Sequence, residues 1–269
     1  MDDVFVFNKV SNKNINKISI VCIIMLFVFR IPLLGLSKFI FSQSIIPIIY
    51  QIFIIGTYLF TALFIWLERD KLSDYHMDAI SIIIFTLGPL WFLYTNLYIR
   101  IPMIIVGLFL LISLFIVNCK LPKITIKTIM WIIIGILAGT ITTLITNYFS
   151  SKQISNVGMK ATFAELMKLF LTQLTNAAIL EEPFFRGCLW GFLRKMNCKE
   201  FTIYLVQVGL FWLGHIYYIN TVPYSFWILV PLSGLVLGFL AWRSRSIGTS
   251  MVTHGVINGL GQFLSFYKF

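Results

Sequence analysis

Residues 44–67 read SIIPIIYQIFIIGTYLFTALFIWL and contain no charged side chain. A helix needs about 20 mainly apolar residues to cross a bilayer, so this stretch predicts a transmembrane helix. Comparable apolar runs occupy most of the chain. Besides 44–67, they are 18–36, 79–97, 101–118, 129–148, 161–193, 202–219, 225–242 and 247–266.

The composition agrees with a chain that lies largely within a membrane. Of the 269 residues, 59% are hydrophobic and 12% are charged, and the mean hydropathy is +0.91. Soluble domains carry about 25% charged residues, so the composition excludes a water-soluble fold. Only helices and closed barrels satisfy every backbone group in lipid, and no run alternates as barrel strands do. The sequence therefore predicts an all-α, polytopic membrane helix bundle of about eight to nine spans.

Two further patterns describe how the runs pack. The run 161–193 is too long for one crossing, and we expect its start, Ala161 to Lys168, to lie along the membrane interface. Glycines four residues apart let helix backbones approach closely in lipid, and here we expect packing within one chain rather than dimerisation. These pairs are Gly135/Gly139, Gly187/Gly191, Gly234/Gly238 and Gly255/Gly259.

The formal net charge of +11 comes mainly from Lys and Arg residues in the loops between runs. Most of these basic residues fall on the side of the N-terminus, which the positive-inside rule places in the cytoplasm. No basic stripe interleaved with aromatic residues is present, so we expect no nucleic-acid partner. The abundance of Ile, Phe, Asn and Lys favours a bacterial cell membrane. The four cysteines show no metal-binding spacing, and we expect Cys22 and Cys188 to be packing residues.

Charged residues inside the runs are few, and each is a candidate functional residue because it costs roughly 2.5–3.5 kcal/mol to insert. Arg30 stands alone in the first run. Residues 177–187, AAILEEPFFRG, carry the other three. Glu182 and Arg186 are four residues apart, so we expect them to pair on one helix face. Glu181 points about 100° away and is expected to face a cavity, beside a kink at Pro183.

Two of the three histidines also lie in apolar runs. His215 ends the stretch FWLGH at 211–215. His254 begins HGVIN at 254–258, where His254 and Asn258 share a helix face. His76 lies in the polar stretch DYHMD, and we expect it to be solvated.

These residues form three motifs: EExxxR at 181–186, FxxxH at 211–215 and HxxxN at 254–258. In this order, the motifs resemble those of the CPBP (Abi) intramembrane proteases, a family that includes type II CAAX prenyl endopeptidases and bacteriocin self-immunity proteins. The resemblance covers about residues 161–263. It implies a catalytic helical core at 151–269 whose helices form the catalytic cavity. Residues 1–150 match only as generic transmembrane helices, and we expect one structural unit.

The resemblance implies hydrolysis of a peptide bond in a membrane-associated or lipidated peptide or protein. Glu181 would be the base that activates water, and His215 would help to hold that water. His254 and Asn258 would stabilise the tetrahedral oxyanion, and the Glu–Arg pair would orient them. The implied catalytic residues are Glu181, Glu182, Arg186, His215, His254 and Asn258.

The family has also been described as metalloproteases. Glu181, His215 and His254 would then be the ligands of a Zn²⁺ ion with one open position. The metal-free and zinc versions need the same residues, and the absence of an HExxH motif favours the metal-free one.

Two alternatives to an enzyme remain open at this point. One is a non-catalytic bacteriocin self-immunity or membrane interaction protein on the same scaffold. The other is a proton-coupled transporter, which lacks the paired broken helices expected of inverted repeats. Neither the substrate nor the oligomeric state follows from the sequence.

Overall fold

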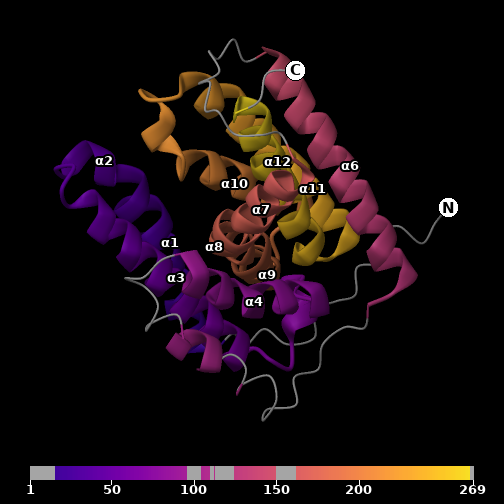
Figure 1. The fold of residues 1–269 in the computed structure, drawn as a ribbon. Helices are drawn as coiled ribbons and strands as arrows, with labels where there is room; N and C mark the ends of the chain where they lie inside the picture. Colours follow the sequence, from indigo (N-terminus) through magenta and orange to yellow (C-terminus); the bar gives the residue numbers. More distant parts are fainter. Residues whose placement is uncertain (1–15, 96–103, 110–111, 113–123, 150–161, 267–269) are drawn as a thin grey trace.

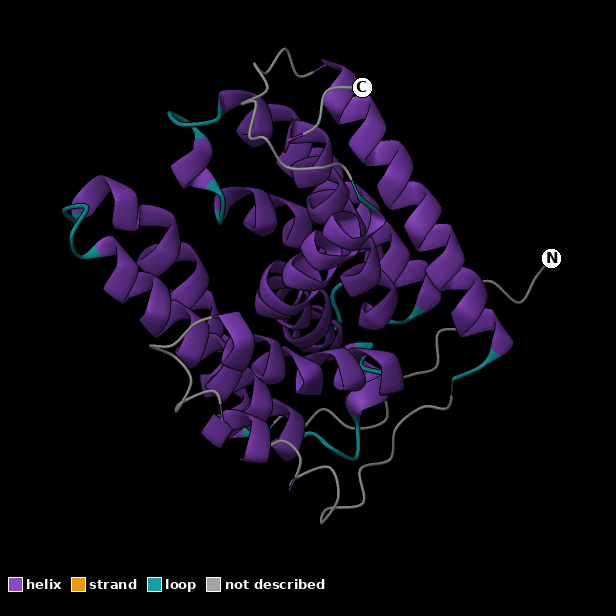
Figure 2. Cartoon of the chain, viewed as in Figure 1, coloured by secondary structure: helices purple, strands orange, loops and turns teal. Residues whose placement is uncertain are grey.

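The computed structural model describes residues 16–95, 104–109, 112, 124–149 and 162–266. All regular secondary structure in these residues is helical (Figure 2). This confirms the predicted all-α membrane bundle. The predicted run 101–118 falls mostly outside the described residues, and the predicted boundary between residues 150 and 151 falls outside them entirely.

The N-terminal helices form a hairpin on one side of the molecule (Figure 1). Helix α1 (Lys17–Val28) begins at Asn16, whose side chain accepts a hydrogen bond from the backbone N–H of Ile18 at 3.0 Å. It continues through the π-helical segment η2 (Phe29–Gly35), which contains Pro32, into α2 (Leu36–Ile40). The chain then returns along α1 as α3 (Ile46–Leu67).

Residues 163–195 form an unbroken helical segment in the middle of the bundle. Its parts are α7 (Phe163–Gln173), π-helical η5 (Leu174–Ala178), α8 (Ile179–Glu182), π-helical η6 (Pro183–Cys188) and α9 (Leu189–Lys195). The π-helical hydrogen bonding of η6 starts at Pro183, which has no N–H to donate to an α-helical ladder. The helix therefore changes its hydrogen-bond register at the proline rather than breaking there.

The remaining helices enclose this segment. They are the 3₁₀ turn η3 (Leu72–Tyr75), α4 (Ala79–Thr95), α6 (Ile126–Phe149), α10 (Glu200–Leu213), the 3₁₀ turn η7 (Ile216–Tyr218), π-helical η8 (Ser225–Leu229), α11 (Val230–Ser244) and α12 (Ile247–Phe266). Helix α12 packs against α6, α7 and α11 (Figure 1). The predicted run 202–219 is not one helix, because α10 ends at Leu213, just before Gly214.

Four helical segments within the described residues are both long and apolar enough to cross a membrane. They are Lys17–Gly35, Ile46–Leu67, Ile126–Phe149 and Ser225–Ser244. Two shorter apolar helices, Ala79–Pro89 and Glu200–Leu213, fall in two other predicted runs. Every predicted run that lies within the described residues therefore overlaps helical structure. The chain is a membrane protein.

The predicted close approach of helices at glycines is found within the chain. A Cβ atom placed on Gly139 of α6 would lie 3.1 Å from the carbonyl oxygen of Thr253 in α12. A Cβ atom on Gly259 of α12 would lie 2.7 Å from Cα of Phe170 in α7. These glycines therefore allow α12 to pack directly against two neighbouring backbones.

The prediction for His76 was wrong. Its side chain is only 1% exposed, and its Nε2 atom accepts a hydrogen bond from Nη2 of Arg194 at 2.7 Å. Its backbone carbonyl accepts from the N–H of Ile247 at 2.8 Å, which holds the loop under the start of α12. Burial, together with the nearby cations Arg194 and Arg245, keeps the pKa of His76 well below its usual value of 6.5. The polar sequence around His76 did not reveal that these distant residues cover it.

The close contact at Gly259 gives a test of the packing. We expect Gly259→Ala to lower the free energy of unfolding by about 1–3 kcal/mol, because the new methyl group meets backbone atoms that cannot move aside. The matched control is Gly209→Ala in α10, where a Cβ would meet nothing within 4 Å. That change should be neutral or stabilise the protein by up to about 1 kcal/mol. Unfolding in detergent micelles measures both, and equal effects would contradict the packing.

Candidate active site

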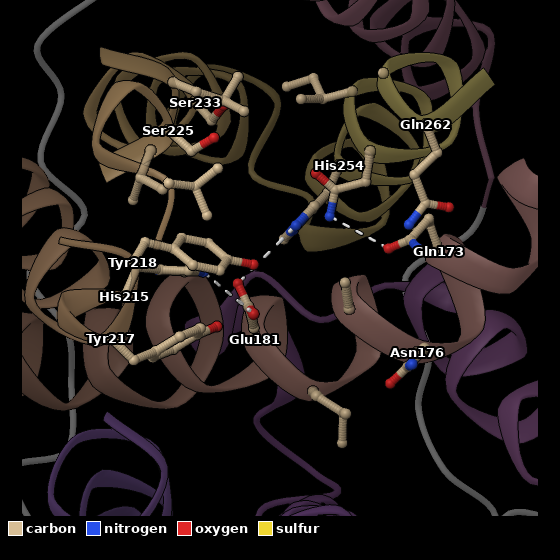
Figure 3. A pocket seen from close by; sticks show the side chains of 18 of the residues that line it. Gln173, Asn176, Glu181, His215, Tyr217, Tyr218, Ser225, Ser233, His254 and Gln262 are labelled. Carbon is tan, nitrogen blue, oxygen red and sulfur yellow. Dashed lines mark hydrogen bonds and ion pairs between the residues drawn. The ribbon is translucent and has the colours of Figure 1, made fainter. Parts of the chain in front are cut away.

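A cavity of about 720 Å³ lies between the N-terminal hairpin and the later helices. Four of the six predicted catalytic residues line it: Glu181, His215, His254 and Asn258. Figure 3 shows Glu181 between the two histidines, each of which comes from a different part of the fold. The predicted direction of Glu181 into a cavity is confirmed.

The two carboxylate oxygens of Glu181 have different surroundings. Its Oε1 atom lies 2.8 Å from Nη2 of Arg30. Its Oε2 atom is buried and has no hydrogen-bond partner, and it faces Nε2 of His254 at 3.9 Å. One oxygen is thus held by a cation while the other is left toward the cavity.

His215 is held by a backbone carbonyl and by Arg30. Its Nδ1 atom lies 2.8 Å from the carbonyl oxygen of Phe211, which can only accept a hydrogen bond. Its Nε2 and Nδ1 atoms lie 2.8 Å and 3.4 Å from Nη2 of Arg30, so this nitrogen lies against the face of the ring rather than in line with the Nε2 lone pair. Nε2 also lies 3.6 Å from Oε1 of Glu181.

His254 is held by a carboxylate, whereas His215 is held by a backbone carbonyl. Its Nδ1 atom donates a hydrogen bond to Oε1 of Glu182 at 2.8 Å. The same oxygen accepts from Nη1 of Arg186 at 3.1 Å, and the other oxygen of Glu182 accepts from the hydroxyl of Ser250. Its Nε2 atom faces Oε2 of Glu181 at 3.9 Å, and in the neutral form with the proton on Nδ1 it would present its lone pair there.

The predicted pair of Glu182 and Arg186 is confirmed. Both side chains are 0% exposed, and they do not line the cavity. The guanidinium of Arg186 also lies over the ring of Phe211, 4.2 Å from its centroid. This pair therefore holds His254 through Glu182 and does not face the cavity.

Asn258 lies on the same wall as His254 but is not in contact with Glu181 or His215. Its Nδ2 atom lies 3.4 Å from Oε1 of Gln173. The sequence placed Asn258 on the correct helix face, but it did not reveal Gln173 as its partner.

Arg30 is the site residue that sequence reasoning left without a role. It comes from η2, far from the three motifs, and is only 3% exposed. The signal was available, because Arg30 is the one charged residue within its apolar run. The sequence did not reveal its partner, because no local pattern connects the first run with Glu181.

One comparison with known proteins matches the part of the chain that carries the three motifs. Residues 163–260 match the Rce1-like family. The description of that family is type II CAAX prenyl endopeptidase Rce1-like. No curated protein and no solved structure matches the chain. The Rce1-like match confirms the resemblance predicted from the three motifs and indicates CAAX-type intramembrane protease activity in general.

The Rce1-like region contains all six predicted catalytic residues, whereas Arg30 lies outside it. The hairpin that carries Arg30 therefore contributes directly to a site that the Rce1-like region does not complete by itself.

Zinc does not fit the site as the side chains stand. Among the described residues, no group of three His, Cys, Asp or Glu side chains is arranged to hold a metal ion. Nη2 of Arg30 already lies 2.8 Å from both Nε2 of His215 and Oε1 of Glu181. A cation at Glu181, His215 and His254 would have to displace the guanidinium, whose positive charge also opposes a second cation there.

The buried pair behind the Rce1-like site should be important for stability. We expect Arg186→Gln to lower the free energy of unfolding by about 3–5 kcal/mol, because it leaves the Glu182 carboxylate buried without its cation. Glu165→Gln is the control, since Lys168 is exposed, Glu165 is only partly buried and their charged groups are 3.8 Å apart. That change should stay within about 0.5 kcal/mol. Similar losses in both variants, measured by unfolding in detergent, would contradict this assignment.

Proposed function

We propose that the protein is an intramembrane endopeptidase that hydrolyses a peptide bond of a membrane-associated or lipidated peptide or protein. The observation that carries this proposal is the pair of acceptors formed by Glu181 Oε2 and His254 Nε2, 3.9 Å apart at the cavity wall. The match to the Rce1-like family supports the reaction class.

Two facing acceptors suit a water molecule that donates one hydrogen bond to each. A water within hydrogen-bond distance of both atoms would have its oxygen lone pairs directed away from them, toward a peptide carbonyl in the cavity. Glu181 is then the general base, and His254 orients the water. Glu182 and Arg186 fix His254 in the tautomer that this requires.

The reaction balances with Glu181 as the only proton carrier. Glu181 takes a proton from the water as the water oxygen bonds to the peptide carbonyl carbon, and a tetrahedral oxyanion forms. The C–N bond then breaks, and Glu181 returns the proton to the leaving amine. The products are a carboxylic acid and an amine, and the carboxylate of Glu181 is restored.

The geometry favours changed roles for two of the predicted residues. His215 donates from Nδ1 to Phe211 and lies against Arg30, so it holds Arg30 rather than the water. His254 presents a lone pair and cannot donate to an oxyanion in this tautomer. We therefore propose Asn258 as the oxyanion donor, through its Nδ2 atom once a substrate carbonyl replaces Gln173 as its partner.

The proposal predicts that Glu181→Gln abolishes cleavage. A general base contributes about 10²–10⁴-fold to the rate, and Gln keeps the size of the side chain but cannot accept the proton. Wild type and Glu181→Gln, each in proteoliposomes with membrane-bound and lipidated peptides, are compared by mass spectrometry of the products. Glu165→Gln is the control and should cleave as wild type does. A Glu181→Gln variant with full activity, or a wild type that cleaves nothing, would sink the proposal.

We also propose that cleavage proceeds without a metal ion. The expected result is that 1,10-phenanthroline leaves kcat unchanged and that purified active protein contains no stoichiometric zinc. The physical reason is that the guanidinium of Arg30 lies between His215 and Glu181, where its positive charge opposes a metal ion. Loss of activity with the chelator and recovery with added Zn²⁺ would contradict this version and favour the set Glu181, His215 and His254 as ligands.

A further inference from the structure

We infer that Arg30 is a positioning residue of the peptidase site, which fixes Glu181 so that Oε2, and not Oε1, meets the water. This inference rests on the proposed function. It assigns a role to a residue of the N-terminal hairpin, outside the region that matches the Rce1-like family.

The contacts of a single nitrogen carry the inference. Nη2 of Arg30 lies 2.8 Å from Oε1 of Glu181 and 2.8 Å from Nε2 of His215. A guanidinium Nη atom carries N–H bonds, so it can donate to Oε1 while it lies against the ring of His215. Because His215 is itself fixed by the carbonyl of Phe211, the guanidinium has a defined position, and so has the Glu181 oxygen that it holds.

The consequence is that the two oxygens of Glu181 are no longer equivalent. Oε1 is engaged by a cation, and Oε2 remains a buried acceptor without a partner beside Nε2 of His254. Rotation of the carboxylate would break the contact with Arg30. The general base is thereby held with its free oxygen toward the proposed water position.

No other side chain can replace Arg30 in this role. Among the described residues that line the cavity, Arg30 and Glu181 are the only Arg, Lys, Asp or Glu side chains. Both are nearly inaccessible, at 3% and 6% exposed. An ionised carboxylate at this depth requires a partner cation, and the cavity offers one.

The position of the guanidinium is also limited by its surroundings. A Cβ atom placed on Gly214 would lie 3.2 Å from Nε of Arg30, so the chain leaves no side chain at that point. The ring centroid of Phe53 in α3 lies 5.7 Å from Cζ of Arg30. The backbone just after α10 and the ring of Phe53 in α3 therefore restrict the movement of the guanidinium.

The first experiment separates positioning from folding by kinetics. Arg30→Gln, Arg30→Lys and the exposed control Arg243→Gln are each assayed in proteoliposomes, with rates normalised to folded protein. We expect Arg30→Gln to lower kcat about 10²-fold, as misplacement of a catalytic group by about 1 Å can do, while KM stays close to wild type. Arg30→Lys keeps the charge and the N–H donors on a shorter side chain without the planar guanidinium, and it should recover part of kcat. Arg243→Gln should match wild type.

Chemical rescue gives a readout that a merely structural residue would not show. In Arg30→Ala, added methylguanidinium can enter the cavity beside Glu181, and we expect it to restore part of kcat. The same additive should restore nothing in Glu181→Gln. Full activity of Arg30→Gln, or a loss that appears only as less folded protein, would overturn the inference.

The second experiment tests the pair without any assay of cleavage. Thermal unfolding is measured for wild type, Arg30→Gln, Glu181→Gln and the double variant. Each single change leaves one buried charge unpaired, so the double variant should unfold at a higher temperature than additivity predicts. Additive effects would overturn the contact itself. If the two substitutions are strongly coupled in unfolding but the wild type cleaves no peptide, the contact is correct and the proposed function is wrong. An active wild type with an active Arg30→Gln would refute the role of Arg30 alone.

Discussion

The burial of charge among apolar helices is the constraint on which this structure depends. Two buried ion pairs lie at or behind the cavity, Arg30 with Glu181 and Arg186 with Glu182. A single unpaired charge there would be costly, and a pair is tolerated only when its hydrogen bonds are satisfied. The pair of Arg30 with Glu181 joins the helix that carries both glutamates to η2, and the contact of His254 with Glu182 joins it to α12. The cavity forms where these helices meet.

The two glutamates show how neighbouring residues acquire different functions from their surroundings. Every oxygen of Glu182 is used, by Arg186, His254 and Ser250, so this side chain can only hold others in place. Glu181 has one oxygen held and one left toward the cavity. The histidines differ in the same way: a carboxylate accepts from Nδ1 of His254, and a backbone carbonyl accepts from Nδ1 of His215.

The geometry is also held by packing that has no chemistry of its own. Helix α12 carries His254, and glycines in it and in α6 let it contact neighbouring backbones directly. The π-helical segments on either side of α8 place the glutamates in a short α-helical stretch with altered hydrogen bonding around it. Such segments are often found at functional sites, and here one of them begins at Pro183.

Much of this could be predicted from sequence because it depends on local periodicity. The apolar runs, the pairing of Glu182 with Arg186 and the shared face of His254 and Asn258 follow from helix geometry and from the need to avoid unpaired charge in lipid. The ion pair of Arg30 with Glu181, the contact of His254 with Glu182 and the burial of His76 could not be predicted in this way. Each joins residues far apart in the chain, and their meeting is set by how whole helices rotate and pack. The sequence by itself therefore determined which residues are candidates for the chemistry, and only the tertiary structure decided which cation holds the proposed base, because that depends on helix packing rather than on spacing along the chain.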